Sequence, residues 1–400
     1  MFVYLDNSAT TKPYSEAVDV MTTVLREDFG NPSSLHTLGI AAEKYIKNAR
    51  KSLATSLGAS EDEVFFTSCG TEADNMAIMG AASARKHQGK KIITTAVEHP
   101  AILEPCKKLE QMGYKVEYIG VDNKCRLNMD QLKAAIDEDT ILISIMGVNN
   151  ETGTIMPLKE IIELKDQFNK AHGTGILMHT DAVQAFGKVP VNVKGDLKGI
   201  DMISVSGHKI HGPKGTGVLY INEKVKIKPI VFGGEQQKNV RSGTENVPGI
   251  VGLGTAVDRA VRTMEERTTK EVELRDYLIG RVMNEIPYTK LNGHSTKRLP
   301  NNANFSFRFI EGEGMLILLD QAGICGSSGS ACTSGSLDPS HVLLAIGLPH
   351  EIAHGSLRLT LSEETTKEDI DYTVDKLAEI IARLRSMSPL YEDFERKNNK

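Results

Sequence analysis

A regular alternation of short apolar runs and longer amphipathic segments, between about residues 60 and 220, constrains this chain most. Seven runs rich in β-branched and aliphatic residues are predicted strands: 64–67, 91–95, 116–119, 141–144, 176–178, 202–204 and 217–221. Helices are predicted at 71–87, 99–112, 130–137 and 157–171. Strands that alternate with helices form a mostly parallel sheet covered by helices on both faces. We therefore predict an α/β fold whose functional residues lie at the carboxyl ends of the strands.

The length of the chain and its later segments predict a second, smaller domain. Four hundred residues exceed what one hydrophobic core usually organises. A long helical stretch at about 246–286 leads into a tail with an α+β pattern. This tail is predicted to contain a strand at 303–309, a helix at 313–322, a loop at 325–338, a helix at 339–346, a strand at 356–361 and a helix at 366–387. We predict a large domain of residues 15–260 and a small α+β domain of residues 1–14 and 261–400, with 392–400 frayed.

Charge and cysteine usage indicate small-molecule chemistry in the cytoplasm. The formal net charge is −5, and acidic and basic residues are interspersed, so no general basic face for nucleic acid is expected. We find no targeting segment and no stretch apolar enough to span a bilayer, so no membrane partner is expected. The five cysteines stand at irregular positions, unlike a secreted disulfide framework, and at least one thiol should be free.

One lysine and one aspartate follow two of the predicted strands. Lys209 lies among small and hydroxylated residues, where a shielded amine can lose its proton and act as a nucleophile. Asp181 follows the apolar run at 176–178. Pyridoxal 5'-phosphate (PLP) requires a lysine to hold its aldehyde and an acid to keep its pyridine nitrogen protonated. The pair predicts a PLP site, and a solvated turn is the alternative for the lysine loop.

Other polar residues at strand ends could complete such a site. The segment that contains Gly70 and Thr71 follows a strand and opens a helix, which suits a phosphate, although an ordinary helix cap is the alternative. Ser206 and His208 flank Lys209 and could also hold the phosphate. His99 could stack on a flat ring and move protons, unless it is a bystander in its loop.

Three more side chains could contact the cofactor or its substrate. Gln184 could reach the phenolic oxygen of the cofactor, and Asn150 offers an amide at another strand end. Arg358 starts a predicted strand, and a guanidinium binds a carboxylate in a bidentate manner. A surface arginine is the alternative.

Cys332 is surrounded by small, polar and flexible residues. We expect it on a mobile, exposed loop, where its thiol is available as a nucleophile. Cys325 follows an apolar run and is expected in a buried strand. The segment His350–His354 matches the zinc-peptidase signature, but Pro349 and Gly355 leave barely more than one helical turn. We therefore predict no metal.

Taken in order, these motifs resemble the cysteine desulfurases of the NifS/IscS type, within the class V aminotransferase group of fold-type I PLP enzymes. The resemblance runs almost end to end. It is carried by Tyr4–Thr11, Phe29–His36, Cys69–Glu72, Glu98–Pro100, Asn149–Gly153, His179–Gln184, Ser206–Lys209, Arg241–Asn246, Ser327–Gly335 and Ala353–Gly355. The sequence departs from the family pattern at Cys325 and at 362–364.

The resemblance implies a role for each matching position. Lys209 would hold PLP covalently, Asp181 would pair with the pyridinium, and His99 would stack on the ring and relay protons. The remaining cofactor-binding positions would be Gly70, Thr71, Asn150, Gln184, Ser206, His208 and Thr244. Thr244 would reach the phosphate of a neighbouring subunit, which implies a homodimer. Asn150, Arg358 and Asn31 would bind the substrate.

The activity that the resemblance implies is desulfuration of L-cysteine to L-alanine. The sulfur would form a persulfide on Cys332 and pass to an iron–sulfur scaffold protein or another acceptor, for cluster assembly or thiolation. Selenocysteine lyase and class V aminotransferase are the alternatives with the same cofactor. A zinc metallopeptidase is the alternative from another class.

Overall fold

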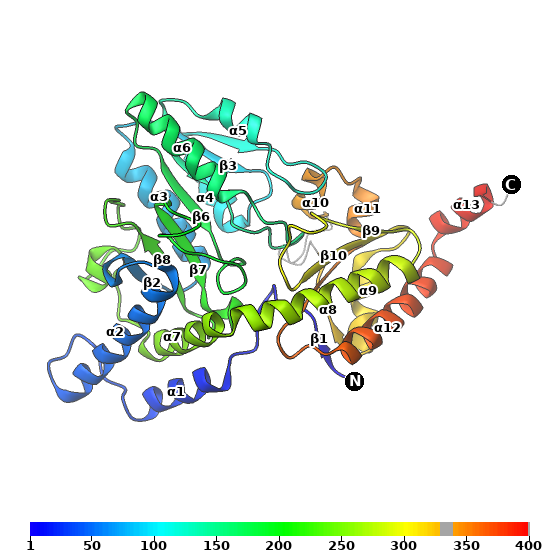
Figure 1. Cartoon of the computed structure of the whole chain (residues 1–400), viewed down its shortest axis with the longest axis horizontal. Helices are drawn as coiled ribbons and strands as arrows, with labels where there is room; N and C mark the ends of the chain where they lie inside the picture. The colour runs from blue at the N-terminus through cyan, green and yellow to red at the C-terminus, as the bar shows by residue number, and fades with distance from the viewer. Residues whose placement is uncertain (329–338, 399–400) are drawn as a thin grey trace.

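A seven-stranded sheet forms the centre of the larger part of the molecule (Figure 1). The computed structural model describes residues 1–328 and 339–398. The strands, in spatial order, are β2 (Val64–Thr67), β8 (Gly217–Ile221), β7 (Met202–Ser206), β6 (Leu177–Asp181), β5 (Thr140–Ser144), β3 (Lys91–Thr95) and β4 (Lys115–Ile119). β8 is antiparallel to both of its neighbours, and every other pair is parallel. This confirms the prediction of a mostly parallel sheet.

Helices bury both faces of this sheet. Ile92 and Ile93 of β3 are both fully buried but point into different cores, as alternation along a strand requires. The core on one face includes residues of α3 (Gly70–Arg85) and α4 (Pro100–Gln111). The core on the other face includes residues of α2 (Thr37–Leu57), α5 (Met129–Ala135), α6 (Leu158–His172) and α7 (Val247–Arg262). Both faces of the sheet are therefore buried.

A separate core forms around a three-stranded antiparallel sheet, the small sheet. Its strands, in spatial order, are β12 (Ser356–Thr360), β10 (Asn302–Phe307) and β9 (Thr289–Leu291). Phe305 and Phe307 are buried there. The helices that contribute to this core are α8 (Met264–Glu285), α9 (Gly312–Gln321) and α12 (Lys367–Ser386). The short helices α10 (His341–Ala345) and α11 (His350–His354) precede β12.

The N-terminal segment runs from the small sheet to the large sheet (Figure 1). Its first strand, β1 (Val3–Tyr4), pairs in parallel with β11 (Ile324–Cys325) beside the small sheet. The chain then crosses to the large sheet, where the Thr11 N–H donates to the carbonyl of His208 at 2.9 Å. The helix α1 (Ser15–Arg26) packs on α7. The backbone of residues 8–11 therefore lies beside the segment that follows β7.

The structure differs from the sequence prediction in several helices. α1 and α2 were not predicted, although Gly58, at φ 70°, ends α2 as a left-handed C-cap glycine should. The predicted helical stretch at 246–286 is two helices, because Thr263 interrupts it and turns its hydroxyl to the carbonyl of Arg259.

The prediction that residues 392–400 fray was wrong for 392–398. These residues belong to α13 (Pro389–Asn398). Phe394 packs against Phe309 and Tyr288, with ring centroids 4.8 and 5.1 Å apart, so aromatic contacts hold a helix with many charged residues. Within residues 1–328 and 339–398, no helix has the length and apolar character needed to cross a membrane. The division into domains near residue 260 stays a prediction.

Candidate functional site

The carboxyl ends of β6 and β7 bring the predicted lysine and aspartate to one edge of the large sheet. Asp181 is the last residue of β6, and its partner in the register with β7 is Ser204. β7 ends at Ser206, and a single 3-10 turn, η2 (Gly207–Lys209), follows it directly. Because the two strands are parallel neighbours, the carboxylate and the amine emerge at the same edge.

The Lys209 amine is held by the backbone of the N-terminal segment. Its Nζ donates to the carbonyl oxygens of Ser8 at 2.5 Å and Ala9 at 2.8 Å. Sequence reasoning missed these two acceptors, because their backbone carbonyls leave no mark in the residue types. The segment Tyr4–Thr11 was noticed only as part of the family resemblance.

Asp181 is a buried carboxylate with few partners. Its side chain accepts one backbone N–H, from Val183 at 2.8 Å. Burial raises the pKa of Asp181 to about 6, against the opposing effects of that N–H and of the Lys209 charge. Asp74, also buried, has its pKa raised by burial and by the charge of Asp181. A protonated ring nitrogen placed against Asp181 would supply the positive charge that this acidic pair lacks, so the carboxylate fits a pyridinium.

His99 caps α4, and its Nδ1 accepts the backbone N–H of Ala101 at 3.1 Å. Burial lowers the pKa of His99 to about 4, and the charges of Lys209 and His341 contribute in the same direction. The imidazole is therefore neutral at neutral pH, and because Nδ1 accepts the Ala101 N–H, Nε2 carries the ring hydrogen and can donate it.

This protonation state can be measured directly. In the protein without cofactor, we expect the His99 imidazole to titrate with a midpoint near pH 4, below the usual 6.5, because burial favours the neutral base. Carbon-13 NMR of histidine-labelled protein follows the titration, and His99→Asn assigns the signal. A midpoint at or above 6.5 would contradict the burial argument.

The start of α3 and the end of β7 form a site with the chemistry of a phosphate pocket. Gly70 is the first residue of α3, and the Cys69 side chain makes no capping hydrogen bond. The buried hydroxyl of Ser206 has no hydrogen-bond partner within the described parts of the chain. A Cβ at Gly70 would lie 3.3 Å from Cβ of Ser206 and 2.7 Å from a methyl of Val183, so the backbone approaches as closely as glycine allows. An unpaired donor beside a helix N-terminus fits a phosphate.

Two further residues predicted for this pocket lie on its elements. Thr71 is exposed in the first turn of α3. His208 lies in η2, with its Nδ1 3.2 Å from the hydroxyl of Thr10. Burial lowers the pKa of His208 to about 4, and nearby lysine charges act in the same direction, so His208 is a neutral partner. Together with Lys209 and Asp181, these residues fit PLP.

Arg358 is placed to receive an anion. Its side chain is only 4% exposed, although arginine usually stands at the surface. Nη1 donates to the carbonyl of Asn150 at 3.0 Å, Nη2 lies 3.1 Å from Oδ1 of Asp6, and Nε has no hydrogen-bond partner among the described residues. A buried guanidinium with a donor to spare suits a substrate carboxylate. Asp6 was missed, and its place in the Tyr4–Thr11 motif was its only signal.

Three of the predicted residues are not joined to this group by any contact that we find in the described residues. Asn31 is exposed between α1 and α2, where its side chain accepts the backbone N–H of Ser33 at 3.0 Å. Thr244 is exposed before α7. Cys332, with most of the predicted 325–338 loop, lies outside the described residues. These three assignments stay predictions.

The remaining cysteines and the zinc-like motif have plain structural settings. Cys325 lies in strand β11 as predicted, but it is half-buried rather than buried. The segment His350–His354 forms the five-residue helix α11, and both of its histidines are exposed. The described residues contain no cluster of three or more potential metal ligands.

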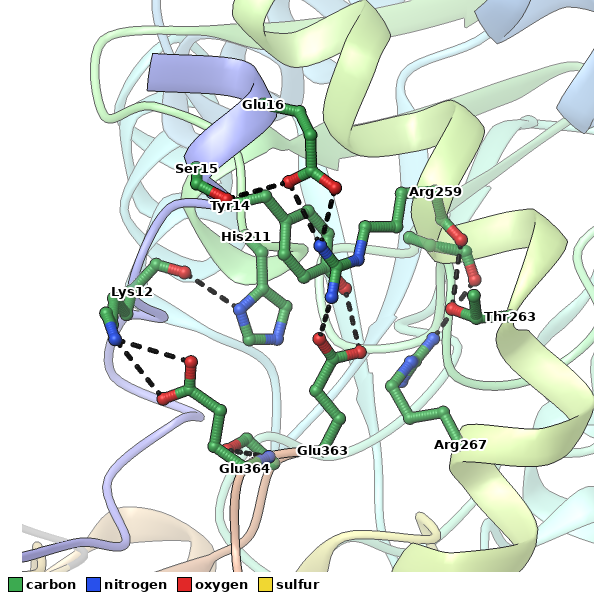
Figure 2. Close-up of polar contacts among 12 residues, drawn as sticks. Lys12, Tyr14, Ser15, Glu16, His211, Arg259, Thr263, Arg267, Glu363 and Glu364 are labelled. Atoms are coloured by element: carbon green, nitrogen blue, oxygen red, sulfur yellow. Dashed lines mark hydrogen bonds and ion pairs between the residues drawn. The ribbon is translucent and has the colours of Figure 1, made fainter. Parts of the chain in front are cut away.

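The loop after Lys209 is fixed by an aromatic stack (Figure 2). His211, two residues later, stacks on Tyr14 with ring centroids 4.5 Å apart. Its Nδ1 is 2.8 Å from the carbonyl of Lys12, and its backbone is in the left-handed region, with φ 62°. A non-glycine residue holds this conformation only where its surroundings enforce it, so these contacts restrain the turn that carries Lys209.

Arg259 of α7 ties this stack to the small sheet (Figure 2). Its guanidinium lies over the Tyr14 ring, 4.1 Å from the centroid, and forms ion pairs with Glu16 at 2.8 Å and Glu363 at 2.6 Å. Glu363 lies in the segment after β12, at one of the two places where the sequence departs from the family pattern. The ion pair with Glu363 therefore links the segment after the small sheet to the stack beside the lysine loop.

Comparison with known proteins places these features in a family. The model of the family described as Aminotransferase class-V matches residues 3–373. A protein of Methanosarcina thermophila named cysteine desulfurase IscS is 52% identical over 388 residues, which is 97% of this chain and 94% of that protein. A cysteine desulfurase IscS of Dictyoglomus turgidum is 49% identical and covers 98% of both chains.

Solved structures agree with this assignment. A structure described as a NifS-like protein has a TM-score of 0.89 and 38% identity, over 96% of this chain and all of that one. A structure described as SspA in complex with cysteine has a TM-score of 0.78 and 32% identity, over 91% of this chain and all of that one. The seven-stranded sheet with its lysine turn is the fold-type I architecture, and the chain belongs to the aminotransferase class-V family.

Proposed function

We propose that this protein is a PLP-dependent cysteine desulfurase, which converts L-cysteine into L-alanine and an enzyme-bound persulfide. The observation that carries this function is the similarity, at about half of all positions and over nearly the full length, to proteins named cysteine desulfurase. The juxtaposition of Lys209 and Asp181 at one sheet edge supports the cofactor. The structure of a relative in complex with cysteine supports the substrate.

Bound PLP supplies an electron sink for the charge that develops at the substrate Cα. Lys209 would hold the cofactor and would take the Cα proton of the substrate. Asp181 keeps the ring nitrogen protonated, which maintains the sink. His99, neutral at working pH, would stack on the ring and relay a proton through Nε2, the ring nitrogen that carries the hydrogen. Arg358 orients the substrate by its carboxylate.

Cys332 is the sulfur acceptor in this proposal. Its thiolate attacks the substrate Sγ, the Cβ–Sγ bond breaks, and a bond between the two sulfurs forms. One cysteine and one protein thiol thus give one alanine and one persulfide, without an external oxidant or reductant. The persulfide then passes to an iron–sulfur scaffold protein or another acceptor. We also propose a homodimer, in which Thr244 reaches the phosphate of the partner subunit, and a cytoplasmic location.

The direct test is to incubate the purified protein with PLP and sulfur-labelled L-cysteine. We expect the peptide that contains Cys332 to gain the mass of one sulfur atom while alanine accumulates. Pyruvate-dependent amino transfer without a persulfide would instead favour an aminotransferase. Faster turnover of selenocysteine than of cysteine would favour a selenocysteine lyase.

Arg358→Lys tests the substrate contact. Lysine keeps the charge but loses the bidentate geometry, so we expect the KM for L-cysteine to rise about tenfold to a hundredfold with a smaller change in kcat. The visible absorption of the bound cofactor should persist, since Arg358 touches the substrate. Steady-state kinetics and an absorption spectrum measure both. An unchanged KM would remove Arg358 from the substrate site.

A further inference from the structure

A second lysine, Lys188, is buried and lines the same small cavity as Lys209. It has no role in the proposed reaction. Its side chain is 5% exposed, in the turn after β6. Its Nζ donates to Oε1 of Gln184 at 3.1 Å, so its partner is a neutral amide rather than a carboxylate. Burying an ammonium group costs free energy that such a partner offsets only in part. We therefore expect a lysine that is buried against a neutral amide to have a function other than packing.

The contact with Lys188 decides which way the Gln184 amide faces. In its charged form the Lys188 amine can only donate, so it selects the amide oxygen and turns the amide nitrogen away. In that orientation, Nε2 of Gln184 donates to the carbonyl of Ser8 at 2.9 Å. The same carbonyl accepts Nζ of Lys209 at 2.5 Å. The flipped amide would set its NH₂ group against the ammonium of Lys188 and its oxygen against the carbonyl of Ser8.

The surroundings of Lys188 hold it in this place. A small cavity is lined by Lys188, Lys209, Arg267 and Glu271. Arg267 of α8 donates to the carbonyls of Gly187 and Ala260 and lies 3.5 Å from Glu271. Burial lowers the pKa of Lys188 to about 7; the charges of Lys209, Arg267 and Arg358 lower it further, and Glu271 opposes them. Within residues 1–328 and 339–398, the acceptor that we find for the Lys188 Nζ is the Gln184 oxygen, so the charged form of Lys188 depends on that contact.

We propose that Lys188 is a positioning residue, which fixes the Gln184 amide so that its NH₂ group faces the phenolic oxygen of bound PLP. This inference rests on the function proposed above. A donor at that oxygen stabilises its negative charge and so lowers the pH at which the bound cofactor titrates. Without Lys188, the amide is free to flip and present its oxygen instead.

The test is the pH titration of the visible absorption of the purified holoprotein. In Lys188→Met, we expect the midpoint to rise by about one pH unit, because one hydrogen bond to a charged oxygen is lost. Lys165→Met is the matched control, since Lys165 of α6 is also buried and donates to a backbone carbonyl, that of Gly199. Its midpoint should equal that of the unmodified protein, although both variants lose a buried lysine.

A double-mutant cycle shows whether Lys188 acts through Gln184. In a Gln184→Leu background, Lys188→Met should cause no further shift. An unchanged midpoint in Lys188→Met, or an equal shift in the Gln184→Leu background, would overturn the inference. If Lys188→Met does not fold, a high-resolution crystal structure of the unmodified holoprotein decides. A distance from Nζ of Lys188 to Oε1 of Gln184 within hydrogen-bond range supports the inference, and one beyond 4 Å overturns it. Failure of the proposed function looks different, because the unmodified protein would then show no cofactor absorption.

Discussion

Replacing Lys209 with alanine is expected to remove the visible absorption of PLP-treated protein and to lower alanine formation from L-cysteine by at least about a thousandfold. The reason is that one amine serves as both the attachment point and the base, so its loss removes two functions at once. Absorption spectra and an alanine assay, both made with PLP in excess, measure the two effects.

Lys214→Ala is the matched control for this prediction. Lys214 lies in the loop after the same strand, but it is exposed. We expect its removal to leave both the spectrum and the rate close to those of the unmodified protein. A Lys209→Ala protein that kept its absorption and its rate would show that the amine is held by Ser8 and Ala9 for a structural reason alone.

The large sheet was predictable because each of its strands carries its own signal. A strand that is covered on both faces is mostly apolar, as in Ile141–Ser144 and Met202–Ser206, and helices separate most of the strands. α1 and α2 carry weaker signals. No side chain caps the start of α1, and a histidine caps α2, so neither opens with the residues that usually mark a helix start.

The site was predictable where a reactive or polar side chain directly follows a predicted strand. Lys209, Asp181 and Ser206 follow apolar runs, so their position at one edge follows from the parallel sheet. The partners of Lys209 could not be predicted in the same way, because Ser8 and Ala9 lie about two hundred residues earlier in the chain. Such contacts depend on how the N-terminal segment packs against the large sheet, and no local sequence pattern encodes that packing.

Lys188 shows most clearly which kind of residue could not be identified from the sequence. Four residues after Gln184, it is one lysine among the many that stand at protein surfaces. Only its burial and its 3.1 Å contact with the amide set it apart. The signal available in the sequence was a lysine placed two residues after the apolar pair Ala185 and Phe186, both of which are buried.

Cys332→Ala is expected to abolish persulfide formation and to lower alanine production at least about a hundredfold, while the visible absorption of bound PLP persists. Three of the other cysteines have settings that disfavour a thiolate. Cys106 and Cys125 are buried, and burial raises the pKa of each thiol to about 12. Burial and nearby acids also raise the pKa of Cys325. A thiol with a raised pKa holds little thiolate at neutral pH.

Cys325→Ala and Cys69→Ala are the controls, because both residues are only half-buried. Each variant should keep its persulfide and its rate. Full turnover by Cys332→Ala, or loss of turnover in Cys325→Ala, would reassign the nucleophile. The absorption spectrum distinguishes the two variants. Lys209→Ala should lose both the cofactor absorption and alanine formation, whereas Cys332→Ala should keep the absorption and lose only sulfur transfer. The two variants therefore assign cofactor binding and sulfur transfer to different residues in one pair of measurements.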